Sequence, residues 1–182
     1  KKLEMLIHLL HKQSSDQVLI FTRTKHRATK LAEQLSKAGF ATASLQGNLS
    51  QNKRDAAMLA FRRGKVKVLV ATDIAARGID VVDVSHVINY DVPDTAEAYT
   101  HRTGRTGRME HLGTAFSLVT QEDLAMVRSI EKLMGLKLER RNVDGYTVRL
   151  NDPRQNAPAK KQGRMSRSNQ KNRYRSSAKQ QS

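Results

Sequence analysis

The chain of 182 residues contains no cysteine. This absence excludes a disulfide framework and any metal site built on thiolates. No apolar run approaches the roughly 18 residues that a membrane-spanning helix needs, and no secretory signal peptide opens the sequence. We therefore expect a soluble cytoplasmic protein that does not bind a membrane, with room for one ordinary domain and an extension.

The C-terminal segment lacks core-forming side chains. Residues 151–182 contain no Leu, Ile, Val, Phe or Trp, and Gln, Asn, Ser, Lys and Arg dominate. Such a segment cannot bury enough apolar surface to offset the entropy lost on ordering. The composition predicts a globular domain over residues 1–150 and a disordered basic tail over residues 151–182.

Acidic residues are too few to balance the basic ones, and the formal net charge is +16. The tail holds nine Lys and Arg against the single Asp152, so it carries half of that excess. Positive charge on this scale favours a polyanionic partner such as nucleic acid or an anionic membrane surface. A generic solubilising charge is the alternative explanation.

Five short β-branched or apolar runs alternate with helical patterns. The runs span residues 18–22, 41–45, 66–71, 85–90 and 114–119. Strands that alternate with helices predict an α/β fold, in which helices cover both faces of a parallel sheet. The runs at 18–22 and 66–71 are apolar throughout, which is typical of central strands.

Caps and glycines place the helix ends. A first helix starts directly at Lys1-Lys2, and the predicted N-terminal caps of later helices include Ser50, Asp94 and Thr120. Gly39, Gly64 and Gly135 stand where helices should end.

In open α/β sheets, ligands bind beyond the carboxyl ends of the strands. After the first run, Thr24 offers a hydroxyl and a helix N-terminus, which suit a phosphate, although a plain helix cap explains it as well. After the second run, Gly47 permits close approach of a ligand to the backbone. Gln51 and Arg54 then share one side of a first helical turn, where a guanidinium can hold a phosphate. A solvated helix start is the alternative.

The third run leads into ATDIAARGID, which combines two acids, an arginine and a glycine where a buried strand emerges. A turn would not need both Arg77 and Asp80. A carboxylate at this place could bind sugar hydroxyls.

The fourth run leads into YTHRTGRTGR. Helical spacing places His101, Arg105 and Arg108 on one face. These groups repel one another without an anion, and the two glycines weaken a helix by roughly 1 kcal/mol each. A bound polyphosphate explains both features, because arginine stabilises charge on a transferring phosphoryl group.

The four segments VLIFTRT, QGNLSQNKR, VLVATDIAARGID and YTHRTGRTGR, in this order, resemble the C-terminal RecA-like lobe of DEAD-box ATP-dependent RNA helicases. The resemblance covers about residues 1–140, and ATDIAARGID followed by HRTGRTGR is its most specific part. The segments TRTKHRA and QGNLSQ are most similar to the bacterial RhlE-type subgroup.

The resemblance implies a role for each matching residue. Contacts to the RNA sugar-phosphate backbone are implied for Thr24, Gly47, Arg54 and Thr72, with Gln51 nearby. Contacts to ATP are implied for Asp80 at the ribose and for the arginine fingers Arg105 and Arg108 at the γ-phosphate. The catalytic residue His101, together with Arg77, is implied to couple the two sites. Gln46, Asn48 and Thr103 depart from the commoner His, Asp and Ile of the family.

Two elements of a complete enzyme are missing. The sequence has no G-x-x-x-x-G-K-[ST] phosphate loop and no Asp-Glu-Ala-Asp run. We expect the Mg²⁺ ligands to come from an N-terminal RecA-like lobe, and the chain to be a piece of a longer protein. Its expected partners are that lobe and RNA, with ATP and Mg²⁺ as cofactors. His8 and His11 lack further metal ligands, and we interpret them as surface residues.

Two other classes of protein remain as alternatives. One is an autonomous nucleic-acid-binding module, which would need neither Asp80 nor the arginines. The other is a lobe of a related DNA helicase, against which the HRTGRTGR form argues. Competition between RNA and DNA, with the first lobe restored, would decide.

Overall fold

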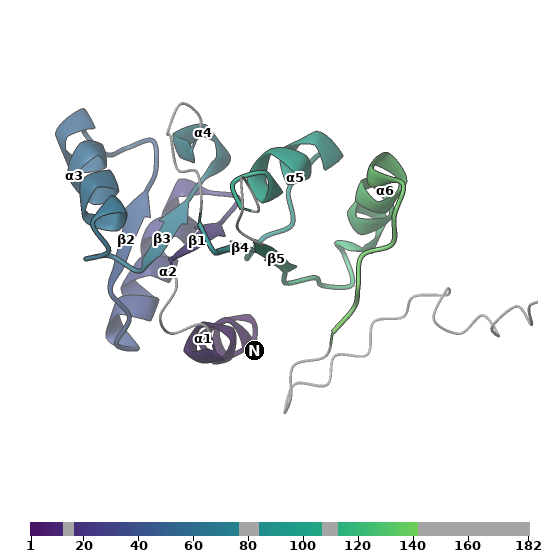
Figure 1. The fold of residues 1–182 in the computed structure, drawn as a ribbon, viewed down its shortest axis with the longest axis horizontal. Coiled ribbons are helices and arrows are strands. Elements are labelled where there is room, and N and C mark those ends of the chain that lie inside the picture. The colour runs from purple at the N-terminus through teal and green to yellow at the C-terminus, as the bar shows by residue number, and fades with distance from the viewer. Residues whose placement is uncertain (13–16, 77–83, 107–112, 142–182) are drawn as a thin grey trace, which may run out of the picture. The chain divides into compact units, whose positions relative to one another are not determined.

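The structure is a computed structural model that describes residues 1–12, 17–76, 84–106 and 113–141 (Figure 1). Its helices are α1 (Lys2–Lys12), α2 (Lys25–Lys37), α3 (Gln51–Arg62), α4 (Asp73–Ala76), α5 (Ala96–Thr103) and α6 (Leu124–Met134). Its strands are β1 (Val18–Phe21), β2 (Thr42–Leu45), β3 (Val68–Ala71), β4 (His86–Asn89) and β5 (Thr114–Ser117).

All five strands pair in parallel, in the order β2-β3-β1-β4-β5. The parallel α/β fold predicted from the sequence is therefore confirmed. The two runs predicted to be central are β1, in the middle of the sheet, and β3 beside it, and both are buried along their whole length.

Helices cover both faces of the sheet (Figure 1). On one face, Leu6 of α1 and Leu31 of α2 pack with Val18 and Ile20 of β1. On the other face, helices α3 and α4 pack against the alternate residues of β1. Because successive strand residues point to opposite faces, an apolar strand supplies both cores.

Several predicted helix ends are confirmed. Thr24 is the N-cap of α2, and its Oγ1 accepts a hydrogen bond of 3.2 Å from the backbone N–H of Arg27. Ser50 is the N-cap of α3. Gly39 and Gly64 follow their helices with φ values of 91° and 69°, a backbone region that favours glycine.

Two predicted caps are wrong by one to three residues. Thr95, and not Asp94, caps α5, because the Thr95 hydroxyl accepts the N–H of Ala98 at 3.1 Å. Asp123 is the N-cap of α6, and both the N–H and the hydroxyl of Thr120 donate to its carboxylate. Thr120 therefore fixes the turn before the helix.

The predicted tail at 151–182, with its boundary at residue 150, lies outside the described residues. Within the described ranges, no helix is long and apolar enough to cross a membrane.

Candidate functional site

The carboxyl ends of four neighbouring strands form one continuous edge. The N–H of Thr22 donates to the carbonyl of Ala71 at 2.9 Å, and the N–H of Thr72 donates to that of Leu45 at 3.3 Å. The N–H of Tyr90 donates to the carbonyl of Phe21 at 3.0 Å. These bonds extend the sheet by one residue and hold the predicted site residue Thr72 in the row. We call this row, with the loops and helix starts that follow it, the carboxyl edge.

The start of α2 contacts the loop after β2. Thr24 is exposed, and beside it Lys25 donates from Nζ to Oδ1 of Asn48 at 3.1 Å. Two segments predicted to share one site are thus joined by a direct hydrogen bond. An Asp at position 48 would pair with the lysine more strongly, so the Asn leaves more of the lysine charge available.

The loop after β2 is shaped by Gln46. Its buried side-chain oxygen accepts a hydrogen bond from the N–H of Asn48 at 2.6 Å. The N–H of Leu49 donates to the backbone carbonyl of Gln46 at 3.2 Å. Gln46 therefore stabilises a tight turn. Gly47 lies exposed at this turn, and a Cβ built on it would meet no atom within 4 Å. A ligand can approach the backbone there closely.

The first turn of α3 completes this part of the edge. Arg54 is half-buried, and its Nη2 donates to the carbonyl of Ala75 in α4 at 3.3 Å. This bond ties α3 to the segment after β3. Gln51 is turned along its own helix and donates to Asp55 at 2.8 Å. The structure thus places Arg54 against α4, the helix that follows Thr72, whereas the amide of Gln51 is bonded within α3.

Two helix N-termini lie at this edge without an acidic residue in their own first turn. Neither α2 nor α3 has an acidic residue in its first turn, and the side chain of Ser50 makes no capping hydrogen bond. A helix N-terminus carries a partial positive charge and N–H groups that lack helical partners. The edge is therefore favourable for anionic groups such as phosphates.

Arg102 is the most highly connected polar side chain beside this edge, and the sequence alone did not reveal it. It is 2% exposed, and it forms a two-pronged ion pair with Asp73 at 2.7 Å and 2.6 Å. Its Nη1 donates to Oδ1 of Asn89 at 3.0 Å and to the carbonyl of Asp91 at 2.7 Å. Its guanidinium also lies 5.1 Å from the centre of the Phe21 ring.

Arg102 consequently joins the segments after β3 and β4 to the end of α5. Asp73, which the sequence offered as one of two acids able to bind a sugar, is occupied by this arginine. One sequence signal could have indicated this role: Arg102 follows Tyr99 by three residues, which places both on the same, buried side of α5.

The prediction that His101, Arg105 and Arg108 share one face of a helix is wrong in part. Helix α5 ends at Thr103, and Gly104 is its C-cap. The N–H of Arg105 donates to the carbonyl of Arg102 at 3.2 Å, which forms a tighter turn. His101 is therefore exposed on the last helical turn, whereas Arg105 follows in a turn of its own. The hydroxyl of Thr103 donates back into α5, to the carbonyl of Tyr99 at 2.9 Å, away from any ligand.

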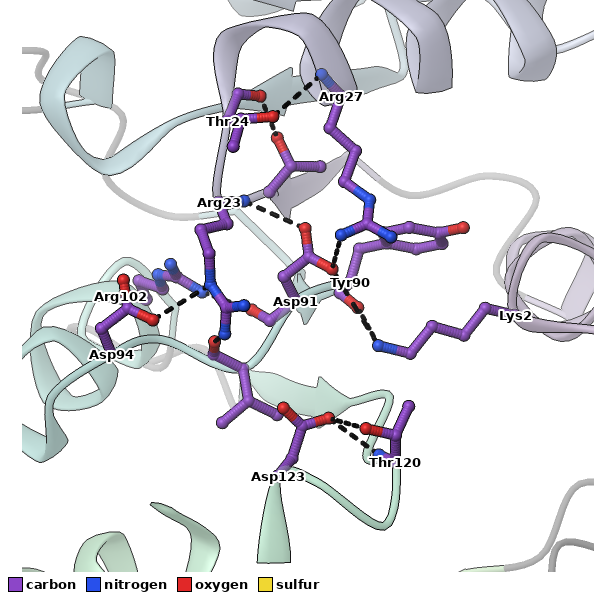
Figure 2. Close-up of polar contacts among 12 residues, drawn as sticks. Lys2, Arg23, Thr24, Arg27, Tyr90, Asp91, Asp94, Arg102, Thr120 and Asp123 are labelled. Atoms are coloured by element: carbon purple, nitrogen blue, oxygen red, sulfur yellow. Dashed lines mark hydrogen bonds and ion pairs between the residues drawn. The ribbon is translucent and has the colours of Figure 1, made fainter. Parts of the chain in front are cut away.

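A second polar network fixes α1 and α2 against the end of β4 (Figure 2). The buried carboxylate of Asp91 accepts the N–H of Arg23 at 3.0 Å and pairs with Arg27 at 3.1 Å. Lys2 donates to the carbonyl of Tyr90 at 3.0 Å. Burial lowers the pKa of Lys2, and the carboxylates of Asp123 and Asp91 oppose that shift. This network holds the start of α2, and so Thr24, in place.

The structure brings together Thr24, Gly47, Arg54 and Thr72 along one edge. His101 lies on the last turn of α5 and Arg105 in the turn after it, next to Thr106, whose hydroxyl donates to the carbonyl of Ser85 before β4 at 3.1 Å. Arg77, Asp80 and Arg108 lie outside the described residues. His11 is exposed as predicted, whereas the surface position predicted for His8 is wrong, because His8 is half-buried. His86 is also half-buried and stacks on Phe116. Within the described ranges, no three His, Asp or Glu side chains gather as a metal site would require.

Comparison with known proteins agrees with this architecture. Residues 1–110 match the model of the helicase conserved C-terminal domain. The chain is 44% identical over 140 residues to the DEAD-box ATP-dependent RNA helicase CshA of Bacillus subtilis, covering 77% of this chain and 28% of CshA. It thus spans less than a third of the length of that curated relative.

Solved structures agree as well. Escherichia coli SrmB, a DEAD-box protein bound to the regulator RraA, is 40% identical with a TM-score of 0.75, over 79% of this chain and 84% of SrmB. Saccharomyces cerevisiae Dbp5, bound to RNA and ADP BeF3, is 36% identical with a TM-score of 0.67, over 74% of this chain and 36% of Dbp5.

The parallel sheet, its carboxyl edge and these structural matches define a RecA-like lobe of the helicase type. Within that class, the chain belongs to the helicase conserved C-terminal domain family, as the C-terminal RecA-like lobe of a DEAD-box helicase. The finer RhlE-type assignment stays a prediction.

Proposed function

We propose that this chain is the second lobe of an ATP-dependent DEAD-box RNA helicase that unwinds or remodels short RNA duplexes. In this proposal the lobe binds the RNA sugar-phosphate backbone and completes an ATP site when an N-terminal RecA-like lobe faces it. The observation that carries the proposal is the carboxyl edge, where sequence segments that are far apart converge on an anion-favouring surface.

The RNA side rests on geometry and charge. Thr24, Gly47, Arg54 and Thr72 lie along adjacent strand ends, and we assign them to backbone contacts, with Gln51 nearby. Contacts to sugar and phosphate carry no base information, so this surface would bind RNA without regard to sequence. The S. cerevisiae Dbp5 structure, of similar fold, contains RNA and ADP BeF3.

The ATP side rests on the segments after β3 and β4. We assign Asp80 to the ribose, Arg105 and Arg108 to the γ-phosphate, and His101 with Arg77 to coupling between the sites. Arg102 supports this assignment as a positioning residue, because its ion pair with Asp73 holds the two segments together. ATP would supply the phosphoryl group whose charge these arginines stabilise, and Mg²⁺ would be held by acids of the N-terminal lobe.

Arg54→Gln tests the RNA half of the proposal. We expect about tenfold or more weaker binding of single-stranded RNA by the chain, because a charge-assisted contact to phosphate is lost. The measurement is fluorescence anisotropy with a labelled strand. Lys53→Gln removes the same charge one residue earlier, from an exposed side chain that we do not assign to RNA, and it should change affinity much less. Equal effects of the two variants would argue against a specific role for Arg54.

The basic tail supplies a second prediction. Residues 151–182 should act as an RNA anchor that ignores sequence, because nine Lys and Arg accompany a single Asp. Arg164, Arg167, Arg173 and Arg175 can meet successive phosphates, and Tyr174 can stack on a base. Four to six contacts would add about 3 to 4 to the slope of log affinity against log salt. Comparing residues 1–150 with the whole chain measures this difference, and equal slopes would leave the tail as an inert solubilising segment.

A further inference from the structure

A second cationic surface lies at the opposite end of the sheet, where the strands begin. It consists of exposed or half-buried side chains at the C-terminal ends of helices α1, α2 and α3 and in the segment before β3. We call it the basic edge, and its residues are Lys12, Lys37, Arg62, Arg63, Lys65 and Lys67. None of them takes part in the site at the carboxyl edge.

Backbone and ring contacts hold these segments together. The rings of His11 and Phe40 lie 5.0 Å apart, which joins the end of α1 to the segment after α2. The carbonyl of Ala41 accepts the N–H of Lys67 at 2.8 Å, which joins that segment to the one before β3. The carbonyl of Lys67 in turn accepts the N–H of Val18 at 2.9 Å. The cations therefore belong to one surface.

Acidic residues are absent from two of the segments that form this surface, and Glu33 lies one helical turn before Lys37 on α2. Among the described residues 34–41 and 60–68 there is no Asp or Glu. Asp16 is the one acid in the segment between α1 and β1, and it lies outside the described residues. Helix C-termini favour cations, but that effect falls off within the last turn. It accounts for Lys12, Lys37, Arg62 and the C-cap residue Arg63, whereas Lys65 and Lys67 lie beyond the end of α3.

The composition of the basic edge favours a nucleic acid over a protein. Four of the six cations are lysines, which are depleted from the cores of protein interfaces, whereas both lysine and arginine neutralise phosphates. Large exposed apolar side chains, which a protein partner would cover, are absent from described residues 34–41 and 62–68, although Leu59 in α3 is exposed.

We propose that the basic edge is a second contact surface for the RNA backbone, which holds the part of a long RNA that extends beyond the carboxyl edge. This inference rests on the proposed function, since it assumes that RNA occupies the carboxyl edge. Strands of four residues separate the two edges by about 13 Å, plus the loops at either end. The four strand ends of the carboxyl edge, each about 4.8 Å from the next, together span about 14 Å across the sheet. A strand of about six nucleotides, about 20 Å long at roughly 3.4 Å each, is therefore taken up when it lies across the carboxyl edge, and it leaves the basic edge uncovered.

The test compares three variants of the whole 182-residue chain on a short and a long RNA. The first carries Lys37→Gln, Arg63→Gln and Lys65→Gln at the basic edge. A matched control carries Lys30→Gln, Lys132→Gln and Lys137→Gln, which removes the same charge from exposed positions on α2, on α6 and after α6. The third is Arg54→Gln at the carboxyl edge. Binding is measured at several salt concentrations, and circular dichroism confirms folding.

For a single strand of about 30 nucleotides, the basic-edge variant should lower the slope of log affinity against log salt by about 2, at 0.7 for each lost contact. The control should leave the slope nearly unchanged. A strand of about six nucleotides should bind the unaltered chain and the basic-edge variant with equal affinity. If the long strand binds the basic-edge variant and the control equally, the inference is overturned. The proposed function then still stands if Arg54→Gln weakens binding of the short strand. If Arg54→Gln also leaves that binding unchanged, the proposed RNA site at the carboxyl edge fails as well. Should the triple variant unfold, Lys65→Gln alone, with a slope loss of about 0.7, gives the same decision.

Discussion

Arg105→Ala in the two-lobed enzyme is expected to lower RNA-stimulated ATP hydrolysis by roughly 10³-fold, the effect that arginine fingers exert on phosphoryl transfer. The structure places Arg105 in the turn after α5, where its backbone N–H binds the carbonyl of Arg102. Arg102 bonds that turn to Asp73 of α4 and to Asn89 of β4, which fixes the position of the backbone from which the Arg105 side chain extends. The same loss is predicted for Arg108→Ala, at a position outside the described residues.

The measurement is steady-state turnover with saturating RNA, together with RNA affinity in the absence of nucleotide. RNA affinity should change little, because neither arginine is assigned to RNA. Arg128→Ala, at an exposed position on α6, is the matched control and should keep near-normal turnover. An Arg105→Ala enzyme with near-normal turnover would show that Arg105 is not an arginine finger.

Arg102→Ala is expected to destabilise the lobe by about 3 kcal/mol, the lower end of the range for removing one partner of a buried ion pair. The lower end applies because the side chain of Asp73 is 42% exposed, so water can solvate its carboxylate after the arginine is gone. The buried Oδ1 of Asn89 and the carbonyl of Asp91 would lose their donor as well. Urea denaturation of the chain measures the effect.

Arg102→Lys separates geometry from charge. A lysine keeps the charge but cannot form two parallel bonds to Asp73 while donating to Asn89, so it should recover only part of the loss. The Asp73→Asn variant should add little to Arg102→Ala, because both substitutions remove the same interaction. A loss below about 0.5 kcal/mol for Arg102→Ala, the range of ordinary surface substitutions, would contradict the positioning role.

The strands were predictable from the sequence because buried parallel strands must be apolar on both faces. Runs such as Val18–Phe21 and Val68–Ala71 therefore differ sharply from the amphipathic helices between them. The residues of the carboxyl edge were predictable for a related reason, since the ends of parallel strands meet on one side of a sheet. Thr24 and Arg54 could be placed there without any coordinates.

The polar contacts between segments were not predictable. The partners of Arg102 come from α4, β4 and the loop after β4, and sequence spacing says nothing about their distance. The prediction that His101, Arg105 and Arg108 lie on one face assumed a continuous helix, but α5 ends before Gly104. The caps at Asp94 and Thr120 failed because Thr95 and Asp123 offered competing side chains within the same turn.

RNA-stimulated ATP hydrolysis tests the central claim most directly, measured for the chain alone and for the chain joined to an N-terminal lobe with a phosphate loop and an Asp-Glu-Ala-Asp run. The account predicts no turnover by the chain alone, with or without RNA, because the sequence has neither a phosphate loop nor that acidic run. It predicts RNA-dependent turnover once the two lobes are joined, and loss of that turnover with Arg105→Ala. Turnover by the chain alone that Arg105→Ala removes, or a joined protein that stays inactive, would contradict the account.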